Sequence, residues 1–205
     1  PLGVMINAEG KRFVDEGEDY RNLTYVRFGR EIMGQPQRTA IQIFDQKTVD
    51  MLRDEYRIRE VTKVESATIE GLAEELEINP QALARTVAEY NAACQPGDYN
   101  PAILDGVGTE GISPAKSNWA LPIDKPPYVA FITTTGITFT FGGLRVNERS
   151  QVQDVTDNSI PGLYAAGELV GGLFFENYPG GSGLMAGAVF GKIAGENAAA
   201  SAQED

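Results

Sequence analysis

Gly162-Leu-Tyr-Ala-Ala-Gly-Glu168, followed by Tyr178-Pro-Gly-Gly-Ser-Gly-Leu-Met-Ala-Gly-Ala-Val-Phe-Gly191, is the stretch of this chain that decides its fold. The apolar run from Leu163 to Ala166 is too short for a helix and predicts a strand that is buried on both faces. The small and apolar residues from Ser182 onward predict a helix that lies close to a sheet, with Ser182 as its N-cap. We therefore expect a strand, a glycine-rich turn and a helix.

This strand, turn and helix are typical of half of a nucleotide-cofactor site. Glu168 follows the strand at its carboxyl end, where ligands bind in open α/β sheets. The glycines before Ser182 leave backbone N–H groups free at the positive end of the helix, where they can face an anionic or electron-rich group. The alternative is a unit that only packs, because glycine-rich turns recur in many α/β proteins.

The composition argues against several classes of protein and site. The 205 residues carry a formal charge of −12, which argues against nucleic acid as a partner. The chain has no histidine and one cysteine, Cys94, so a metal site is not expected. No apolar run approaches the roughly 20 residues of a membrane span, and no signal-peptide pattern opens the chain. Since one cysteine cannot form an internal disulfide, we expect a reducing, cytoplasmic location.

Local patterns predict an α+β organisation of short elements. Strands are expected at 4–7 and 12–15 as a hairpin around Gly10, at 40–44, at 128–141, and at 144–146 and 152–155 as a second hairpin. Helices are expected at the end of 15–30 and at 48–56, 68–76 and 79–94, the last started by Asn79-Pro80. The stretch 95–127 contains several prolines and glycines, which predicts a long surface or active-site loop.

Further segments carry a resemblance to a known family. They are Gly10-Lys-Arg-Phe-Val-Asp-Glu16, Ala40-Ile-Gln-Ile-Phe-Asp45, Thr68-Ile-Glu-Gly-Leu-Ala73 and Ala88-Glu-Tyr-Asn91. With the glycine-rich stretch, they make the chain resemble, nearly end to end, the C-terminal part of the FAD-dependent fumarate reductase/succinate dehydrogenase flavoprotein family. That family includes 3-ketosteroid dehydrogenases and tricarballylate dehydrogenase. Tyr20-Arg-Asn-Leu-Thr24 and Tyr178-Pro-Gly-Gly-Ser-Gly183 look most like tricarballylate dehydrogenases.

The resemblance implies FAD as the cofactor and a two-domain plan with a boundary near Thr140. Residues 1–140 would form a substrate-capping domain of short strands and helices, and residues 141–205 the C-terminal hairpin, strand and helix of the FAD-binding domain. The strand–G-x-G-x-x-G–helix unit of a dinucleotide site is not expected anywhere in the chain. We therefore expect a fragment, inactive alone, whose N-terminal Rossmann half belongs to the same parent chain; its electron partner is unknown.

The resemblance also implies roles for individual residues. Glu168 would hydrogen-bond the ribityl chain of FAD. The backbone at the start of the following helix would face the pyrimidine edge of the flavin; its residues are Gly180, Gly181, Ser182, Gly183 and Leu184. Arg21 matches, with one extra residue in the preceding turn, the cap arginine that exchanges a proton with the substrate while its neighbouring carbon exchanges a hydride with flavin N5.

An arginine has a pKa above about 12 and is a poor base, so this role requires a desolvated site and a relay of carboxylates. Glu16, Glu18 and Asp19 are candidates for that relay. The alternative is that Arg21 only pairs with these acids in a solvated loop.

Two positions depart from the fumarate reductases of the family. There a histidine and an arginine bind a substrate carboxylate, whereas this chain has Phe139, with Thr138 beside it, and Tyr178. Tyr178 could hydrogen-bond a substrate oxygen, lie against the flavin edge or pack in the core. We expect a small-molecule substrate larger than fumarate, a polycarboxylate of the tricarballylate type or, alternatively, a steroid-like ketone. A non-catalytic binding module that retains the cap fold is a further alternative.

Overall fold

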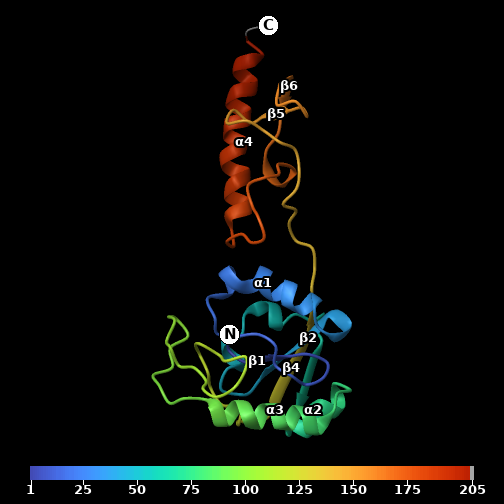
Figure 1. Cartoon of the computed structure of the whole chain (residues 1–205), viewed down its shortest axis with the longest axis vertical. Coiled ribbons are helices and arrows are strands. Elements are labelled where there is room, and N and C mark those ends of the chain that lie inside the picture. Colours follow the sequence, from blue (N-terminus) through green and yellow to red (C-terminus); the bar gives the residue numbers. More distant parts are fainter. Residues whose placement is uncertain (204–205) are drawn as a thin grey trace. The chain divides into compact units, whose positions relative to one another are not determined.

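The computed structural model describes residues 1–203, and the chain divides into two compact units, Pro1–Thr135 and Gly136–Asp205 (Figure 1). Each unit has its own sheet and its own hydrophobic core. The division falls shortly before Thr140, the position at which we placed a boundary from the sequence.

The first unit is built on a four-stranded antiparallel sheet with the order β1-β2-β4-β3. Its strands are β1 (Val4–Ile6), β2 (Thr39–Phe44), β3 (Lys63–Ser66) and β4 (Tyr128–Thr134). The central pair, β2 and β4, is in register from Thr39 opposite Thr134 to Phe44 opposite Val129. Since β-branched and aromatic residues dominate this pair, both of its faces can carry a core.

Helices pack on both faces of this sheet (Figure 1). They are α1 (Arg21–Met33), α2 (Ile69–Glu75) and α3 (Pro80–Ala93). On one face, α2 and α3 bury Leu72, Leu83 and Val87 against strand residues that include Ile6 and Ile43. On the other face, Ile32 of α1 packs near Met5 and Ala40. Neighbouring strand residues point to opposite faces, which is why one short strand serves both cores.

The local signals for several elements are confirmed. The strand expected at 40–44 is β2, and the helices expected at 68–76 and 79–94 are α2 and α3. The Thr68 hydroxyl accepts the Gly71 N–H, and the Asn79 side chain accepts the Ala82 N–H, as N-caps do. Gly10 has φ +76°, and its hairpin is reduced to a bridge between Ile6 and Arg12. The region 15–30, expected to be a loop leading into a short helix, is helical from its seventh residue, because α1 begins at Arg21 and has 13 residues.

The expectation of a helix at 48–56 is wrong. Two separate 3-10 turns occur there, η2 (Val49–Met51) and η3 (Asp54–Tyr56). Leu52, between them, has an extended backbone with φ −67° and ψ 145°. Its side chain is buried in the same core cluster as Phe44, so tertiary packing overrides the helical periodicity.

The stretch 95–127 forms neither helix nor strand and is largely exposed, as expected of a surface loop, but several of its side chains enter the core. Trp119 is 2% exposed, and its indole Nε1 donates to the carbonyl of Ile103 at 2.7 Å. Lys116 is buried as well, and its ammonium donates to the carbonyl oxygens of Pro1 and Gly3. A loop can enter a core in this way because side chains satisfy its backbone polar groups.

The second unit contains a two-stranded sheet of β5 (Gln151–Gln153) and β6 (Ser159–Tyr164) and the long helix α4 (Ser182–Ser201). Its small core comprises Val152, Ala165 and Val170. None of the helices within residues 1–203 has both the length and the apolar character that crossing a bilayer requires.

Three expectations for this region are confirmed only in part. The strand expected at 128–141 ends at Thr134. Of the expected hairpin, the structure keeps an antiparallel bridge from Val146 to Val152, with backbone hydrogen bonds from Gln153 to Arg145 and from Asn147 to Gln151, while β5 also pairs with β6. The run 163–166, expected to be buried on both faces, is buried only in part, with Leu163 at 43% and Ala165 at 6% exposure, since β6 has a single strand neighbour and contacts α4.

Candidate functional site

Glu168 lies in a 3-10 turn, η4 (Gly167–Leu169), two residues after the end of β6. Its Oε1 atom accepts the amide N–H of Thr140 at 2.8 Å and the hydroxyl of the same residue at 3.2 Å. The side chain is otherwise exposed, and no hydrogen bond within residues 1–203 uses Oε2. One carboxylate oxygen is therefore fixed by the protein and the other is free for a hydroxyl donor.

The segment that carries Thr140 is held against η4 by a close backbone approach. Leu144 donates its N–H to the Leu169 carbonyl at 2.8 Å, and Gly171 donates to the Leu144 carbonyl at 3.0 Å. A Cβ at Gly143 would lie 2.2 Å from the Leu169 carbonyl oxygen, so only glycine permits this approach. These contacts determine the distance between Thr140 and Glu168.

The start of α4 presents free backbone donors. Gly181 has φ +88° and occupies the N-cap position, so Ser182 is the first helical residue rather than the N-cap that we predicted. The Ser182 hydroxyl donates to the Pro179 carbonyl at 2.6 Å and does not cap an amide. No hydrogen bond within residues 1–203 uses the N–H groups of Gly183 and Leu184. Such N–H groups at a helix N-terminus are suited to an anionic or electron-rich acceptor.

Four aromatic rings form a cluster beside this helix start. Its members, called the aromatic cluster below, are Phe139, Phe141, Phe174 and Tyr178. Phe139 stacks on Tyr178 with ring centroids 5.1 Å apart and an interplanar angle of 29°. Phe139 also covers the helix start, because a Cβ at Gly183 would lie 2.6 Å from its ring. Thr138, one residue before Phe139, is exposed and is not a member of the cluster.

These residues fit one part of FAD. A polyhydroxylated chain can donate to Glu168 Oε2, and the free amides of Gly183 and Leu184 can donate to ring acceptors. Nothing comparable among the described residues fits a pyrophosphate. Gly106-Val-Gly-Thr-Glu-Gly111 has G-x-G-x-x-G spacing, but it lies in the 95–127 loop, where no helix follows it.

Arg21 is the first residue of α1 and is exposed. Within residues 1–203, no hydrogen bond or ion pair of its side chain occurs. Of the acids expected near it, Glu18 pairs with Arg27, and Asp19 accepts the amide N–H of Tyr20. The structure therefore assembles neither the expected carboxylate relay nor the alternative surface pair around Arg21.

The third acid, Glu16, is buried with Arg12. Arg12 Nε donates to Glu16 Oε1 at 3.0 Å, Arg12 Nη2 donates to Glu16 Oε2 at 2.5 Å, and the side chains are 5% and 3% exposed. The Met5 N–H also donates to Glu16 Oε1, and Arg12 Nη1 donates to the Pro114 carbonyl. The Gly10–Glu16 segment thus joins β1 to the 95–127 loop, which is a structural role.

The sequence reasoning missed Thr140, Phe141 and Phe174. A signal was present, because Thr138-Phe-Thr-Phe-Gly-Gly143 and Phe174-Phe175 place aromatic residues beside glycines that permit close backbone approach. Nothing local indicated that segments 28 residues apart would meet at Glu168.

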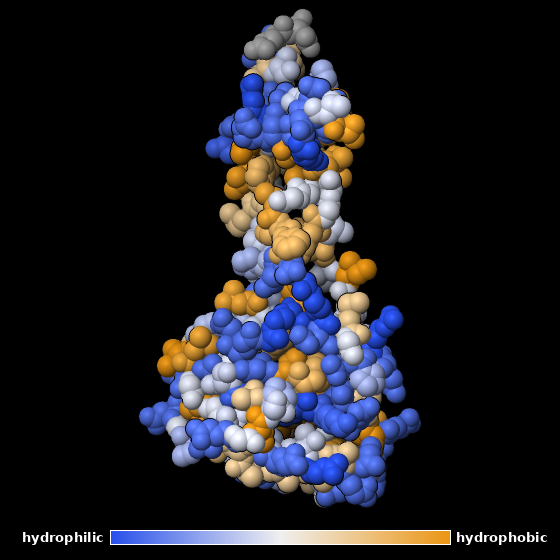
Figure 2. All heavy atoms as spheres, viewed as in Figure 1, coloured by the Kyte–Doolittle hydropathy of each residue, from blue (hydrophilic) through white to orange (hydrophobic). Residues whose placement is uncertain are grey.

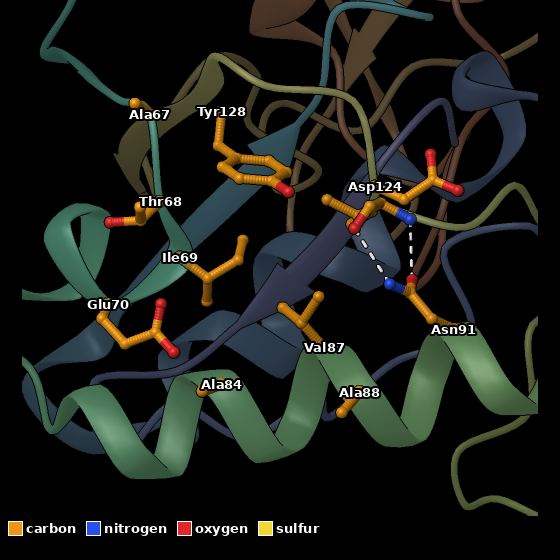
Figure 3. A pocket seen from close by; sticks show the side chains of 11 residues that line it. Ala67, Thr68, Ile69, Glu70, Ala84, Val87, Ala88, Asn91, Asp124 and Tyr128 are labelled. Atoms are coloured by element: carbon orange, nitrogen blue, oxygen red, sulfur yellow. Dashed lines mark hydrogen bonds between the residues drawn. The ribbon is translucent and has the colours of Figure 1, made fainter.

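The first unit has a groove of about 390 Å³ between α2, α3 and residues 123–128 (Figure 3). Val87 and Tyr128 form part of its apolar wall, and Glu70 and Asp124 contribute carboxylates. The Asn91 amide accepts the Ile123 N–H and donates to the Ile123 carbonyl, which joins the loop to α3. None of the site residues expected from the sequence lines this groove.

Comparisons with known proteins identify relatives among flavoproteins and fumarate reductases. The chain is 33% identical over 199 residues to a probable fumarate reductase of Shewanella frigidimarina, covering 96% of this chain and 31% of that protein. It matches the open conformation of a flavocytochrome c3 fumarate reductase with a TM-score of 0.73 and 31% identity, over 98% of this chain and 33% of that one. It matches 3-ketosteroid Δ1-dehydrogenase from Sterolibacterium denitrificans with a TM-score of 0.69 and 27% identity, over 98% and 39%.

The chain thus spans between about a third and two fifths of the length of these relatives. A family model described as an FAD binding domain matches residues 1–184, which include Glu168, the aromatic cluster and the start of α4. FAD is the cofactor that this match and the flavoprotein relatives indicate. The chain belongs to the FAD binding domain family.

Proposed function

We propose that this chain is the C-terminal part of an FAD-dependent oxidoreductase that oxidises or reduces a C–C bond next to a carboxylate or carbonyl. The observation that carries the proposal is the arrangement of Glu168, with one free carboxylate oxygen, beside the free amides at the start of α4 and the aromatic cluster. Gly187 of α4 packs closely on Gly167, which keeps the carboxylate turn and the helix together. FAD, when bound, supplies a flavin that exchanges a hydride with a substrate carbon.

Each residue has a defined role in this proposal. Glu168 Oε2 accepts a ribityl hydroxyl, and the backbone from Gly180 to Leu184 faces the flavin ring. Arg21 exchanges a proton with the carbon next to the one that exchanges the hydride; because Arg21 is exposed and has no carboxylate relay among residues 1–203, this role requires the rest of the parent protein to bury it and to supply the relay. The Tyr178 hydroxyl donates a hydrogen bond to a substrate oxygen, which stabilises negative charge that develops there.

The surface of the second unit supports a further segment of the same parent protein. Leu184, Met185 and Val189 of α4 are 80%, 59% and 50% exposed, and Figure 2 shows hydrophobic residues on the surface of this unit. A helix that is apolar on all sides is normally buried in a larger protein. We propose that an N-terminal Rossmann half covers this surface, that residues 1–140 act as the cap, and that the 205-residue chain alone binds FAD weakly and is inactive.

The aromatic cluster bears on the class of substrate. Where fumarate reductases are expected to hold carboxylate-binding cations, this chain has Phe139 and Tyr178, which carry no positive charge. Each charge-assisted hydrogen bond lost costs roughly 1.5–3 kcal/mol, so fumarate binding would weaken about a hundredfold or more. A tricarballylate-type acid would bind through cations elsewhere in the parent. The four packed rings favour the second candidate, a flat hydrophobic ketone, because such a substrate can stack on them.

The test is a steady-state assay of the parent flavoprotein, with a redox dye in place of the unknown electron partner. The assay compares fumarate, tricarballylate and a 3-ketosteroid. We expect a yellow protein with low fumarate activity and turnover of one of the larger substrates. Tyr178→Arg should increase fumarate reduction, whereas Tyr178→Phe should reduce turnover of the preferred substrate. A colourless protein would favour a non-catalytic binding module, and efficient fumarate reduction by the wild type would refute our interpretation of Phe139 and Tyr178.

A further inference from the structure

Thr140 lies where the carboxylate turn meets the aromatic cluster. Its amide N–H and its hydroxyl both donate to Oε1 of Glu168, at 2.8 and 3.2 Å. Its two chain neighbours, Phe139 and Phe141, are both members of the aromatic cluster, with ring centroids 6.3 Å apart. One residue therefore links the carboxylate to two of the four rings.

Further contacts hold the chain in place on both sides of Thr140. Gly172 donates its N–H to the Phe141 carbonyl at 3.3 Å, so the chain on the far side of Phe141 is tied to the segment that follows η4. On the other side, Phe139 lies against Gly183 at the start of α4. A movement of Thr140 would shift Phe139 away from that helix start and leave Glu168 Oε1 without either donor.

We propose that Thr140 is a positioning residue that couples cofactor binding to substrate selection: it holds Glu168 Oε1 so that Oε2 faces the cofactor, and it holds Phe139 and Phe141 in the wall that contacts the substrate. This inference rests on the proposed function. Thr140 acts through Glu168 and the two rings, without touching either ligand. Loss of its hydroxyl therefore weakens FAD binding and also lowers the preference for a flat hydrophobic substrate.

The test uses Thr140→Val in the intact parent flavoprotein, because valine has nearly the same shape and keeps the amide donor. We expect the dissociation constant of FAD, measured by flavin fluorescence, to rise about tenfold, as for loss of one charge-assisted hydrogen bond. We also expect the ratio of kcat/KM for a 3-ketosteroid to that for fumarate to fall. Thr140→Ser keeps both donors and should restore both values.

The chain offers a matched control. Thr156 donates its amide and its hydroxyl to one carboxylate oxygen of Asp154, each at 2.8 Å, in an exposed turn between β5 and β6. Thr156→Val removes the same kind of bond and should change neither FAD affinity nor the substrate ratio. An equal effect of both valine variants would indicate general destabilisation and would overturn the inference.

A double-mutant cycle with Glu168→Ala tests whether Thr140 acts through the carboxylate. The two substitutions should be strongly non-additive in the free energy of FAD binding, because each removes the same interaction. Additive effects, or an unchanged FAD affinity in Thr140→Val, would overturn the inference while leaving the proposed function intact. A wild-type parent without flavin would overturn both.

Discussion

Substitution of Glu16 by Gln removes the acid of the buried Arg12–Glu16 pair. The pair has two hydrogen bonds between its side chains, a third from the Met5 N–H, and side chains that are only 5% and 3% exposed. Glutamine keeps the shape of glutamate, but its NH₂ group replaces one acceptor with a donor and its amide carries no charge. Arg12 would then remain buried without a counter-charge.

The magnitude follows from this burial. Breaking a buried ion pair by removing one partner costs about 3–5 kcal/mol, a large share of the roughly 5–15 kcal/mol that stabilises a typical protein. For a unit of about 150–250 residues that unfolds cooperatively, the loss corresponds to a decrease in Tm of about 6–20 °C. The exposed pair Arg53–Glu55, with side chains 60% and 57% exposed, gives the control, since Glu55→Gln should leave Tm unchanged.

The assay is thermal unfolding of the intact parent protein, followed by circular dichroism, for the wild type and both variants. Urea unfolding at constant temperature provides the free-energy difference directly. A decrease in the free energy of unfolding of less than about 1 kcal/mol for Glu16→Gln would refute the reasoning, because a buried guanidinium without a counter-charge should destabilise the protein by more than that.

Three further predictions concern other parts of the chain. Burial lowers the pKa of Lys116 to about 8 from 10.5. Between these two pH values the unfolded chain therefore binds more protons than the folded chain does. The free energy of unfolding should rise with pH over that window by up to about 3 kcal/mol. Urea titrations of Lys116→Met should show a smaller rise. Arg21→Ala in the parent should strongly lower kcat at unchanged flavin content, and Arg21→Lys should restore it only in part; near-normal kinetics of the alanine variant would exclude the proton-transfer role. Gly181→Ala should destabilise the protein by about 1–2 kcal/mol in urea unfolding and reduce flavin content because of its φ of +88°, whereas Gly191→Ala, inside α4 with open space around it, should not.

Signals confined to a few neighbouring residues were readable without a structure. The caps Thr68 and Asn79 start α2 and α3, and Gly10 makes its turn with positive φ, because these conformations depend on groups within about four residues. The glycine-rich stretch likewise predicted a strand, turn and helix, and its resemblance to flavoproteins led to the correct family.

Contacts between distant segments decided everything else. Leu52 breaks the helix expected at 48–56 because its side chain is buried beside Phe44, and β5 pairs with β6 as well as with Val146. Glu16 is buried in an ion pair with Arg12 and does not lie beside Arg21. Glu168 accepts a hydrogen bond from Thr140, which is 28 residues away in the sequence. Such partners are selected by the burial of apolar surface and by the need to satisfy polar groups in the folded chain, and neither depends on sequence spacing.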